Sequence, residues 1–447
     1  MLACRSILSA LAVAIGAGVL SAQSPTPAGG AAVAIPDSPI GVMLREWLDA
    51  FNNADSVKLA NYYRKYQLER NISQQLARAR TTGGFELVSI ERALPRRIEA
   101  IWKERNTGTV TWMAAELADE GQPGMKYSYL MPVPQSGSLD DLKVDAAERA
   151  RIIEAAIAKL DEHYVFPEVA AKMATAVREQ NTRGAYDDIV AGPVFALRLT
   201  EDFQGVSKDK HLRVNFSGPR IPERRQVFEP DPAERARFRA QMERDNCGFE
   251  KTEVMANNVG YLKFNFFADP DVCGDIATRE MQKLADVDAL IVDLRENGGG
   301  SPAMVAHVTS YLFSKRVHLN DLWTRRTNET KEYWTQPELP GQKVRDEVPV
   351  YVLTANRTFS GAEEFTYNLK NLKRATIIGE VTGGGAHPVS GHKIDDHFMI
   401  GVPFARAINP YSKTNWEGTG VTPDVKVPAA EAMDVALRMI REKPATP

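Results

Sequence analysis

The chain has few cysteines, no basic stretch and neither of the common glycine motifs that cradle phosphates. Its 447 residues include three cysteines, and 55 lysines and arginines against 58 aspartates and glutamates give a net charge of -3. No run of Lys or Arg could follow a phosphate backbone, so the composition argues against a nucleic-acid-binding protein. Neither G-x-x-x-x-G-K-[ST] nor G-x-G-x-x-G occurs, which argues against a nucleotide-binding loop of either kind.

Long apolar runs are lacking outside the N-terminus. There, Arg5 precedes an apolar run from Ile7 to Leu20, and the small residues Ser21 and Ala22 follow. This pattern predicts a secretory signal peptide at residues 1–22. The alternative is a retained anchor, but the run is short for a span of about 20 residues. We therefore expect an exported protein, periplasmic or extracellular, with no membrane span after cleavage; the oligomeric state stays open.

Cleavage of this segment would remove Cys4 and leave Cys247 and Cys273. An even pair of cysteines in an oxidising compartment is compatible either with a disulfide or with two free thiols. Residues 23–37 consist mainly of Ser, Pro, Gly and Ala, which cannot bury apolar surface, and predict a flexible leader.

Residues 38–135 predict a separate α+β domain. Ile40, Leu44, Trp47, Leu48 and Phe51 recur at helical spacing, and a second helix follows with Ser56 placed to cap it. Four strand-like segments come next, at 84–94, 96–105, 108–117 and 125–133. Two helices followed by an antiparallel sheet resemble an NTF2-like domain, although a generic interaction or oligomerisation domain has the same element order.

The pattern of apolar and charged residues divides the remainder of the chain into four segments. Residues 140–215 predict a helical subdomain, and residues 216–258 a charged connector, either a solvated helix or a mobile segment. Residues 259–430 predict an α/β domain, because short runs of Val, Ile and Leu alternate with helical patterns. These expected buried strands lie at 259–267, 288–295, 348–355 and 375–380. Residues 431–447 predict a C-terminal helix and tail.

A serine stands at one of the junctions between a buried strand and a helix. Ser360 follows the strand expected at 348–355 and precedes a helical pattern. Backbone N–H groups and the helix dipole favour negative charge at such a position, which suits a nucleophile. Serine is also a preferred helix N-cap, so a capping role is the simpler interpretation of this residue alone.

Three consecutive glycines occupy a similar junction. Gly298, Gly299 and Gly300 follow the strand expected at 288–295 and precede an apolar helix. Glycine allows backbone N–H groups to approach a ligand closely, and an oxyanion needs such donors. By itself a glycine run is most often only a turn.

Three motifs taken in order resemble the S41 peptidases, a family that includes tail-specific processing proteases, tricorn-type proteases and interphotoreceptor retinoid-binding protein. The motifs are "DLRENGGG", "RTFSGAEEF" and "GEVTGGGAHP", and the resemblance covers residues 140 to 430. It implies a crotonase-like α/β catalytic core with Ser360 as the nucleophile of peptide-bond hydrolysis. It also implies an oxyanion hole made by the N–H of Gly361 and one N–H among Gly298, Gly299 and Gly300.

The same resemblance bears on the general base. The processing proteases carry a lysine in the segment equivalent to "GEVTGGGA", where this chain has Gly385, so a lysine base is not expected. Tricorn-like members use a His and a Glu, and "DKHLRV" and "NWEGTGVTPDV" resemble those segments. We therefore expect His211 as the base and Glu417 as its carboxylate partner. Without the resemblance, His211 would be interpreted as structural and Glu417 as a solvated loop charge.

Some positions depart from the family pattern. Lys210 stands where tricorn-like members have a hydroxyl residue, and Gly361 is not an acid that could select a basic substrate side chain. The interval from Val214 to Val259, about 45 residues, is too short for a PDZ module, so none is expected. Histidines at 387, 392 and 397 lack the compact spacing of a zinc site, and no metal or cofactor is expected.

The sequence as a whole predicts an exported serine peptidase that acts on peptides or unfolded protein segments. The main alternative is a carrier of apolar ligands, a retinoid or a fatty acid, because relatives with this fold bind such ligands without proteolysis. A third possibility is crotonase-type acyl chemistry on a thioester. Export argues against it, since coenzyme A thioesters are chiefly intracellular.

Overall fold

The computed structural model describes residues 33–442 except for 69, 134–141 and 224–231. The predicted signal peptide at 1–22 and most of the leader at 23–37 therefore lie outside the described residues. Within the described part, none of the helices combines the length and the apolar character that a membrane span requires.

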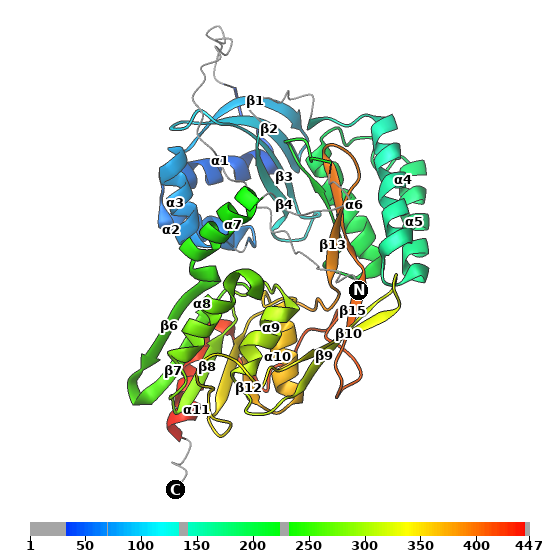
Figure 1. Ribbon diagram of the computed structural model, residues 1–447. Helices are drawn as coiled ribbons and strands as arrows, with labels where there is room; N and C mark the ends of the chain where they lie inside the picture. Colours follow the sequence, from blue (N-terminus) through cyan, green and yellow to red (C-terminus); the bar gives the residue numbers. More distant parts are fainter. Residues whose placement is uncertain (1–32, 69, 134–141, 224–231, 443–447) are drawn as a thin grey trace.

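The N-terminal part has three helices followed by an antiparallel sheet of four strands (Figure 1). The elements are α1 (Pro39–Asn52), α2 (Ser56–Lys65), α3 (Ile72–Thr82), β1 (Phe85–Ala93), β2 (Arg97–Glu104), β3 (Val110–Leu117) and β4 (Met125–Pro132). The sequence predicted the four strands but only two helices. It also misassigned the cap of α2, since the Asp55 carboxylate accepts the N–H groups of Val57 and Lys58.

This sheet is covered on both faces. Helices α1 to α3 pack against one face, where Trp47 and Phe51 contact Phe85. The other face contributes Ile101 and Trp112 to a second core. That core belongs mainly to α4 (Ala146–His163), α5 (Pro167–Thr182) and α6 (Gly192–Ser207), the helical subdomain that the sequence predicted. The N-terminal sheet thus packs between two sets of helices.

The α/β core is a six-stranded sheet with the order β16-β12-β11-β8-β7-β6. Its strands are β6 (Phe249–Met255), β7 (Val259–Phe264), β8 (Ala289–Asp293), β11 (Val350–Thr354), β12 (Ala375–Gly379) and β16 (Val425–Lys426). All neighbouring pairs are parallel except β6 with β7. Four of these strands lie where the apolar runs predicted them, and the α/β class of the core is confirmed.

Strand β6 corrects the predicted connector at 216–258. That stretch does contain a charged helix, α7 (Pro232–Arg244), but its last part pairs with β7 and forms the edge of the sheet. Edge strands expose much of their surface and carry charged side chains. The sequence of β6, "FEKTEVM", therefore resembled a solvated segment.

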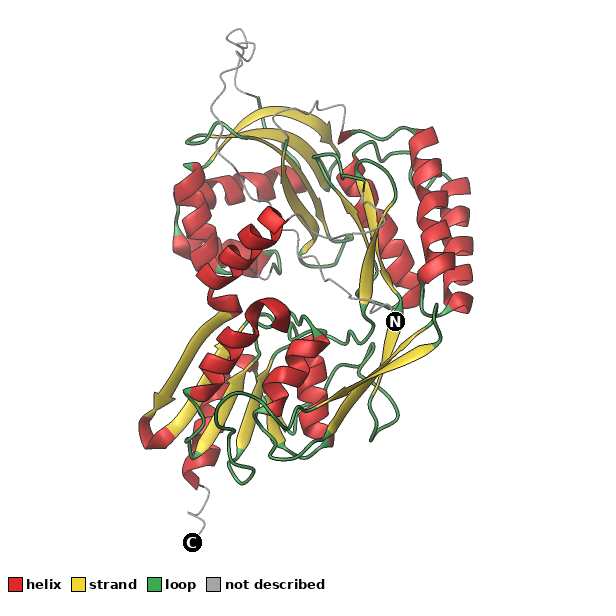
Figure 2. Cartoon of the chain, viewed as in Figure 1, coloured by secondary structure: helices red, strands yellow, loops and turns green. Residues whose placement is uncertain are grey.

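Helices cover both faces of the core sheet (Figure 2). On one face lie α8 (Pro270–Gln282), α9 (Pro302–Ser310) and α10 (Gly361–Asn371), and on the other α11 (Ala432–Glu442), the helix predicted at the C-terminus. A disulfide joins Cys247, just before β6, to Cys273 in α8. The two cysteines that the sequence left open are thus paired.

Two small sheets complete the structure. One has the order β10-β9-β15, from β9 (His318–Thr324), β10 (Glu329–Trp334) and β15 (Ala405–Ile408). The other has the order β13-β14-β5, from β5 (Arg213–Phe216), β13 (Val389–Lys393) and β14 (Phe398–Pro403). Because β5 pairs with β14, the chain segment just before β5 lies beside the core.

Candidate active site

Two adjacent parallel strands end side by side and carry Ser360 and the glycine run. β8 leads into residues 294–301 and α9, whereas β11 leads into residues 355–360 and α10. Since the carboxyl ends of neighbouring parallel strands lie at the same edge of a sheet, the two loops meet there. Ser360 is the N-cap residue of α10 and is partly exposed.

Ser360 has an unusual backbone conformation, with φ 55° and ψ -121°. Such a conformation is strained for a residue with a Cβ and persists only where surrounding contacts enforce it. Gly299 provides one of these contacts. A Cβ built on it would lie 2.6 Å from the N atom of Gly361 and 2.7 Å from Cβ of Ser360, and its φ is 98°. Position 299 therefore tolerates only glycine.

Some backbone N–H groups of this loop donate hydrogen bonds to other residues, and others have no acceptor among the described residues. The N–H of Gly298 donates to the Asn265 carbonyl at 3.1 Å, and that of Gly299 to Oδ1 of Asn297 at 2.8 Å. No described residue accepts a hydrogen bond from the N–H of Gly300 or of Gly361. A Cβ on Gly361 would lie 2.9 Å from the N atom of Gly300, so the two unused donors are neighbours.

Glu363 connects the turn at Ser360 to the loop at 382–385. Its Oε2 accepts the N–H of Ser360 at 2.9 Å and that of Gly385 at 2.8 Å. Its Oε1 accepts the N–H of Gly384 at 2.6 Å and the hydroxyl of Thr382. Burial raises the pKa of this carboxyl, and the four hydrogen bonds oppose the rise. Glu363 was not among the predicted site residues, although S-x-x-E from Ser360 is a capping-box pattern.

His211 lies against the residue that precedes the serine. The centroids of its ring and of the Phe359 ring are 4.6 Å apart. Its backbone N–H donates to Oδ1 of Asp209 at 3.0 Å, and the neighbouring Lys210 donates to the Gly383 carbonyl at 2.6 Å. Among the described residues, no hydrogen bond joins the His211 ring to Ser360. Nδ1 of His211 is buried and has no hydrogen-bond partner in the described part of the chain.

Glu417, in the loop after β15, lies near His211. Potential ligand atoms of Asp209, His211 and Glu417 all lie within 4.8 Å of one another. Oε2 of Glu417 accepts the N–H of Ala386 at 2.5 Å, whereas Oε1 is buried and, like Nδ1 of His211, has no hydrogen-bond partner among the described residues. The structure thus brings His211 and Glu417 together without a hydrogen bond between them. Carboxylate and imidazole ligands of this kind could also hold a divalent cation.

Asp209 and His387 belong to the same cluster and were missed as site residues. Nδ1 of His387 lies 2.7 Å from Oδ2 of Asp209 and 3.4 Å from Oε2 of Glu417. Asp209 is 1% exposed, and the Tyr164 hydroxyl donates to its Oδ2 at 3.4 Å. No local pattern could predict this contact, because 178 residues separate His387 from Asp209.

The other two histidines of the segment lie elsewhere. His392 stacks on His163 with ring centroids 4.0 Å apart, and His397 stacks on Phe216 at 5.8 Å.

Burial sets the protonation of the cluster. It lowers the pKa of His211 to about 4, although the Asp209 carboxylate acts in the opposite direction. It raises the pKa of Glu417 to about 7, and Asp209 adds to the rise. For His211, the loss of solvation by the imidazolium therefore outweighs the attraction of the neighbouring carboxylate.

Another buried carboxyl lies one turn along α10 from the serine. The N–H of Glu364 donates to the Ser360 carbonyl at 2.9 Å, and the side chain is 4% exposed. Burial raises the pKa of Glu364 to about 7, while the nearby Asn320 amide lowers it. None of the described residues forms a hydrogen bond with Oε1 of Glu364.

Comparisons with known proteins give matches to one peptidase family. Residues 258–427 match the model of Peptidase family S41, and residues 146–243 match the model described as the N-terminal domain of Peptidase_S41 in eukaryotic IRBP. A curated relative is carboxyl-terminal-processing peptidase 2, chloroplastic, from Arabidopsis thaliana. It is 27% identical over 176 residues, which cover 39% of this chain. The matched region spans 33% of that relative's length.

Solved structures with similarity include the photosystem II D1 C-terminal processing protease, with a TM-score of 0.38 and 17% identity over 63% of this chain and 93% of that one. The tricorn protease has a TM-score of 0.45 and 13% identity over 80% of this chain and 41% of that one. The two family models match consecutive parts that together make up more than half of the chain. The chain therefore belongs to Peptidase family S41.

Proposed function

We propose that the protein is an exported serine peptidase that hydrolyses peptide bonds through an acyl-enzyme. The observation that carries this proposal is the strained Ser360 at the start of α10 with two unused backbone donors, Gly300 and Gly361, next to it. A nucleophile beside free N–H groups is what acyl transfer requires, because negative charge develops on the carbonyl oxygen during attack.

The proposed first step is attack of Oγ of Ser360 on the peptide carbonyl carbon, with His211 accepting the hydroxyl proton. The N–H groups of Gly300 and Gly361 stabilise the oxyanion, since those of Gly298 and Gly299 already have acceptors. The protonated His211 then donates its proton to the amine that leaves. Water hydrolyses the ester by the same route in reverse, and Ser360 is regenerated.

Glu417 has the role of stabilising the imidazolium of His211, which burial makes costly. A carboxyl can do so only in its charged form, and the pKa of about 7 means that this form is gained near neutral pH. Asp209 adds negative charge to the cluster and fixes the backbone of His211. We assign Asp209 as a positioning residue, because its contacts are with His211 and His387 rather than with the serine turn.

We also propose that the protein is exported and that its signal peptide is removed. The predicted signal peptide supports it, and so does the Cys247–Cys273 disulfide, since such bonds form and persist in oxidising compartments. N-terminal sequencing of the mature protein from a periplasmic or secreted fraction should find a start near residue 23. A chain that still begins at Met1 and stays with the membrane would support the retained anchor instead.

A serine-directed fluorophosphonate probe tests the nucleophile. The mature protein should be labelled at Ser360, and Ser360→Ala should abolish both labelling and cleavage of a peptide library. Ser56→Ala is the matched control, because Ser56 is exposed and lies in the N-terminal domain. Labelling that persists in Ser360→Ala would refute the assignment. Saturable binding of retinoids or fatty acids without turnover of any peptide would support the carrier alternative.

A further inference from the structure

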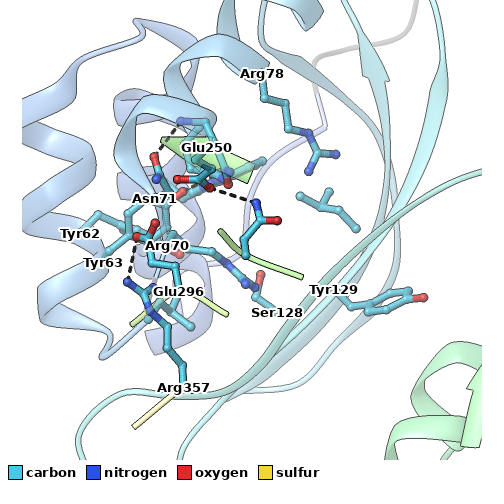
Figure 3. A pocket seen from close by; sticks show the side chains of 16 residues that line it. Tyr62, Tyr63, Arg70, Asn71, Arg78, Ser128, Tyr129, Glu250, Glu296 and Arg357 are labelled. Carbon is cyan, nitrogen blue, oxygen red and sulfur yellow. Dashed lines mark hydrogen bonds and ion pairs between the residues drawn. The ribbon is translucent and has the colours of Figure 1, made fainter. Parts of the chain in front are cut away.

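A polar cavity of about 560 Å³ lies between the N-terminal domain and the α/β core (Figure 3). One wall comes from α2, α3, the turn between them and β4, and it includes Arg70 and Arg78. The opposite wall comes from the core and includes Glu250, Asn265, Glu296 and Arg357. A volume of this size is typical of sites that bind small ligands or short chain segments.

The core wall of this cavity is continuous with the loops of the proposed active site. The carbonyl of Asn265 accepts the N–H of Gly298 at 3.1 Å, next to the proposed oxyanion donors. Arg357 lies three residues before Ser360, and its guanidinium donates to the Arg295 carbonyl at 3.2 Å. Glu296 and Arg357, which line the cavity, belong to the same two loops as Gly300 and Ser360.

The charges on the core wall are already compensated. Glu296 pairs with Arg357 at 3.1 Å and with Lys263 at 2.7 Å. Glu250 also pairs with Lys263 at 2.7 Å and accepts from the Asn265 amide at 2.9 Å. This wall thus offers neither a free carboxylate nor a free guanidinium.

The opposite wall carries two guanidinium groups, those of Arg70 and Arg78. Neither guanidinium group forms an ion pair or a hydrogen bond with any residue in the described part of the chain. Both guanidinium groups act on Tyr63, which also lines the cavity: they lower its pKa, against the larger effect of burial. Among the described residues that line the cavity, those of the N-terminal domain therefore carry an excess of positive charge.

We propose that Arg70 and Arg78 bind a carboxylate of the peptide substrate while its scissile bond lies at Ser360. Guanidinium groups bind carboxylates through two parallel N–H donors, which provides both charge and geometry. The carboxylate has two sources, an acidic side chain or the free end of the peptide. This inference rests on the proposed peptidase function, and it gives the N-terminal domain a role in substrate selection.

Binding to the inactive variant Ser360→Ala tests the inference without relying on turnover. The probes are three short fluorescein-labelled peptides of otherwise equal sequence, compared by fluorescence anisotropy. One has Asp and Glu side chains and an amidated end, one has Asn and Gln with an amidated end, and one has Asn and Gln with a free carboxylate. We expect at least one carboxylate-bearing peptide to bind about tenfold more tightly than the neutral one, with a preference that weakens at high salt.

Arg70→Gln with Arg78→Gln should abolish that preference while leaving binding of the neutral peptide unchanged. The matched control is Arg64→Gln with Arg80→Gln, which removes the same charge from exposed positions of α2 and α3 outside the cavity. The peptide that loses affinity identifies the source of the carboxylate. Equal affinity for all three peptides, or loss of the preference in both double variants, would overturn the inference.

The same peptides separate this inference from the proposed function. If the wild-type protein cleaves peptides but Arg70→Gln with Arg78→Gln has no effect on charge preference, the inference fails and the peptidase stands. If the carboxylate preference is present and lost in that variant, but no peptide is cleaved and Ser360 is not labelled, the peptidase proposal fails and the binding site stands.

Discussion

The nucleophile region and the base region of the proposed site are built in different ways. Ser360 and the glycine loop follow two adjacent strands of one sheet, and backbone hydrogen bonds and Glu363 determine their geometry. His211 and Glu417 come from segments 206 residues apart, and both carry buried atoms without partners. The nucleophile region is therefore preorganised by its backbone, whereas the state of the base region depends on which of its groups are protonated.

This difference has a physical cause. N–H donors of the backbone do not titrate, so the oxyanion hole has the same charge distribution at every working pH. In the base region, burial makes the charged forms of both His211 and Glu417 costly. Activity should thus depend on pH through the base region and on steric fit through the nucleophile region.

The largest expected effect comes from removing either reacting group. Ser360→Ala and His211→Ala should each lower kcat by about four to six orders of magnitude, and the double variant should be no worse than either single one, because the two groups act as a unit. Steady-state kinetics on a cleaved peptide measures this. His392→Ala should stay within a few-fold of wild type. Near-wild-type activity of His211→Ala would assign the base to another group, with Lys210 the first to test.

A steric change should damage the nucleophile region alone. Gly299→Ala places a methyl group 2.6 Å from the N atom of Gly361 at a φ of 98°. We expect kcat to fall by about 10² to 10³, the usual effect of disturbing an oxyanion hole. Gly298→Ala is the matched control, since its Cβ would have no atom within 4 Å. Equal activity of the two variants would mean that the close approach at Gly299 has no role in catalysis.

The pH profile should report the base region. Glu417 must be charged to stabilise the imidazolium, so kcat/KM should rise about tenfold per pH unit below 7 and level off above it. His211, with a pKa of about 4, stays neutral throughout this range. Glu417→Gln should be less active, and its kcat/KM should no longer rise with pH below about 7. A wild-type profile that is flat from pH 5 to 8 would contradict the raised pKa of Glu417.

The smallest effect concerns stability in the nucleophile region. The pKa of Glu364 is about 7 when folded, above the ordinary value of 4.5, so folding favours its protonated form. Its contribution to the free energy of unfolding should fall by about 3 kcal/mol as pH rises from 4.5 to 7, and then stay constant. Glu364→Gln should remove this loss. Urea unfolding of the wild type and of Glu364→Gln at pH 5 and pH 8 gives the free energy of unfolding of each protein. If the difference in this free energy between the two proteins is the same at both pH values, the raised pKa of Glu364 is contradicted.

Much of the nucleophile region could be predicted because its signals are local. Each half of this region begins with a run of Val, Ile and Leu, continues with the three glycines or with Ser360, and ends in a helical pattern. Such a pattern predicts a strand, a turn and a helix within about 20 residues. The α/β class follows from several such units in succession. Strand β6 escaped prediction because it lies at the edge of the sheet, where charged side chains weaken the apolar pattern.

The sequence by itself determined the family, the α/β core and the positions of Ser360, Gly361 and the glycine run. Only the tertiary structure decided that, within the described residues, the N–H of Gly298 has an acceptor and that of Gly300 has none, and that His387 pairs with Asp209. It alone paired Cys247 with Cys273 and placed Arg70 and Arg78 opposite the core. Local patterns reflect the backbone conformation of neighbouring residues. Free donors, pKa values and cavities depend instead on burial and on contacts between segments that only the folded chain brings together.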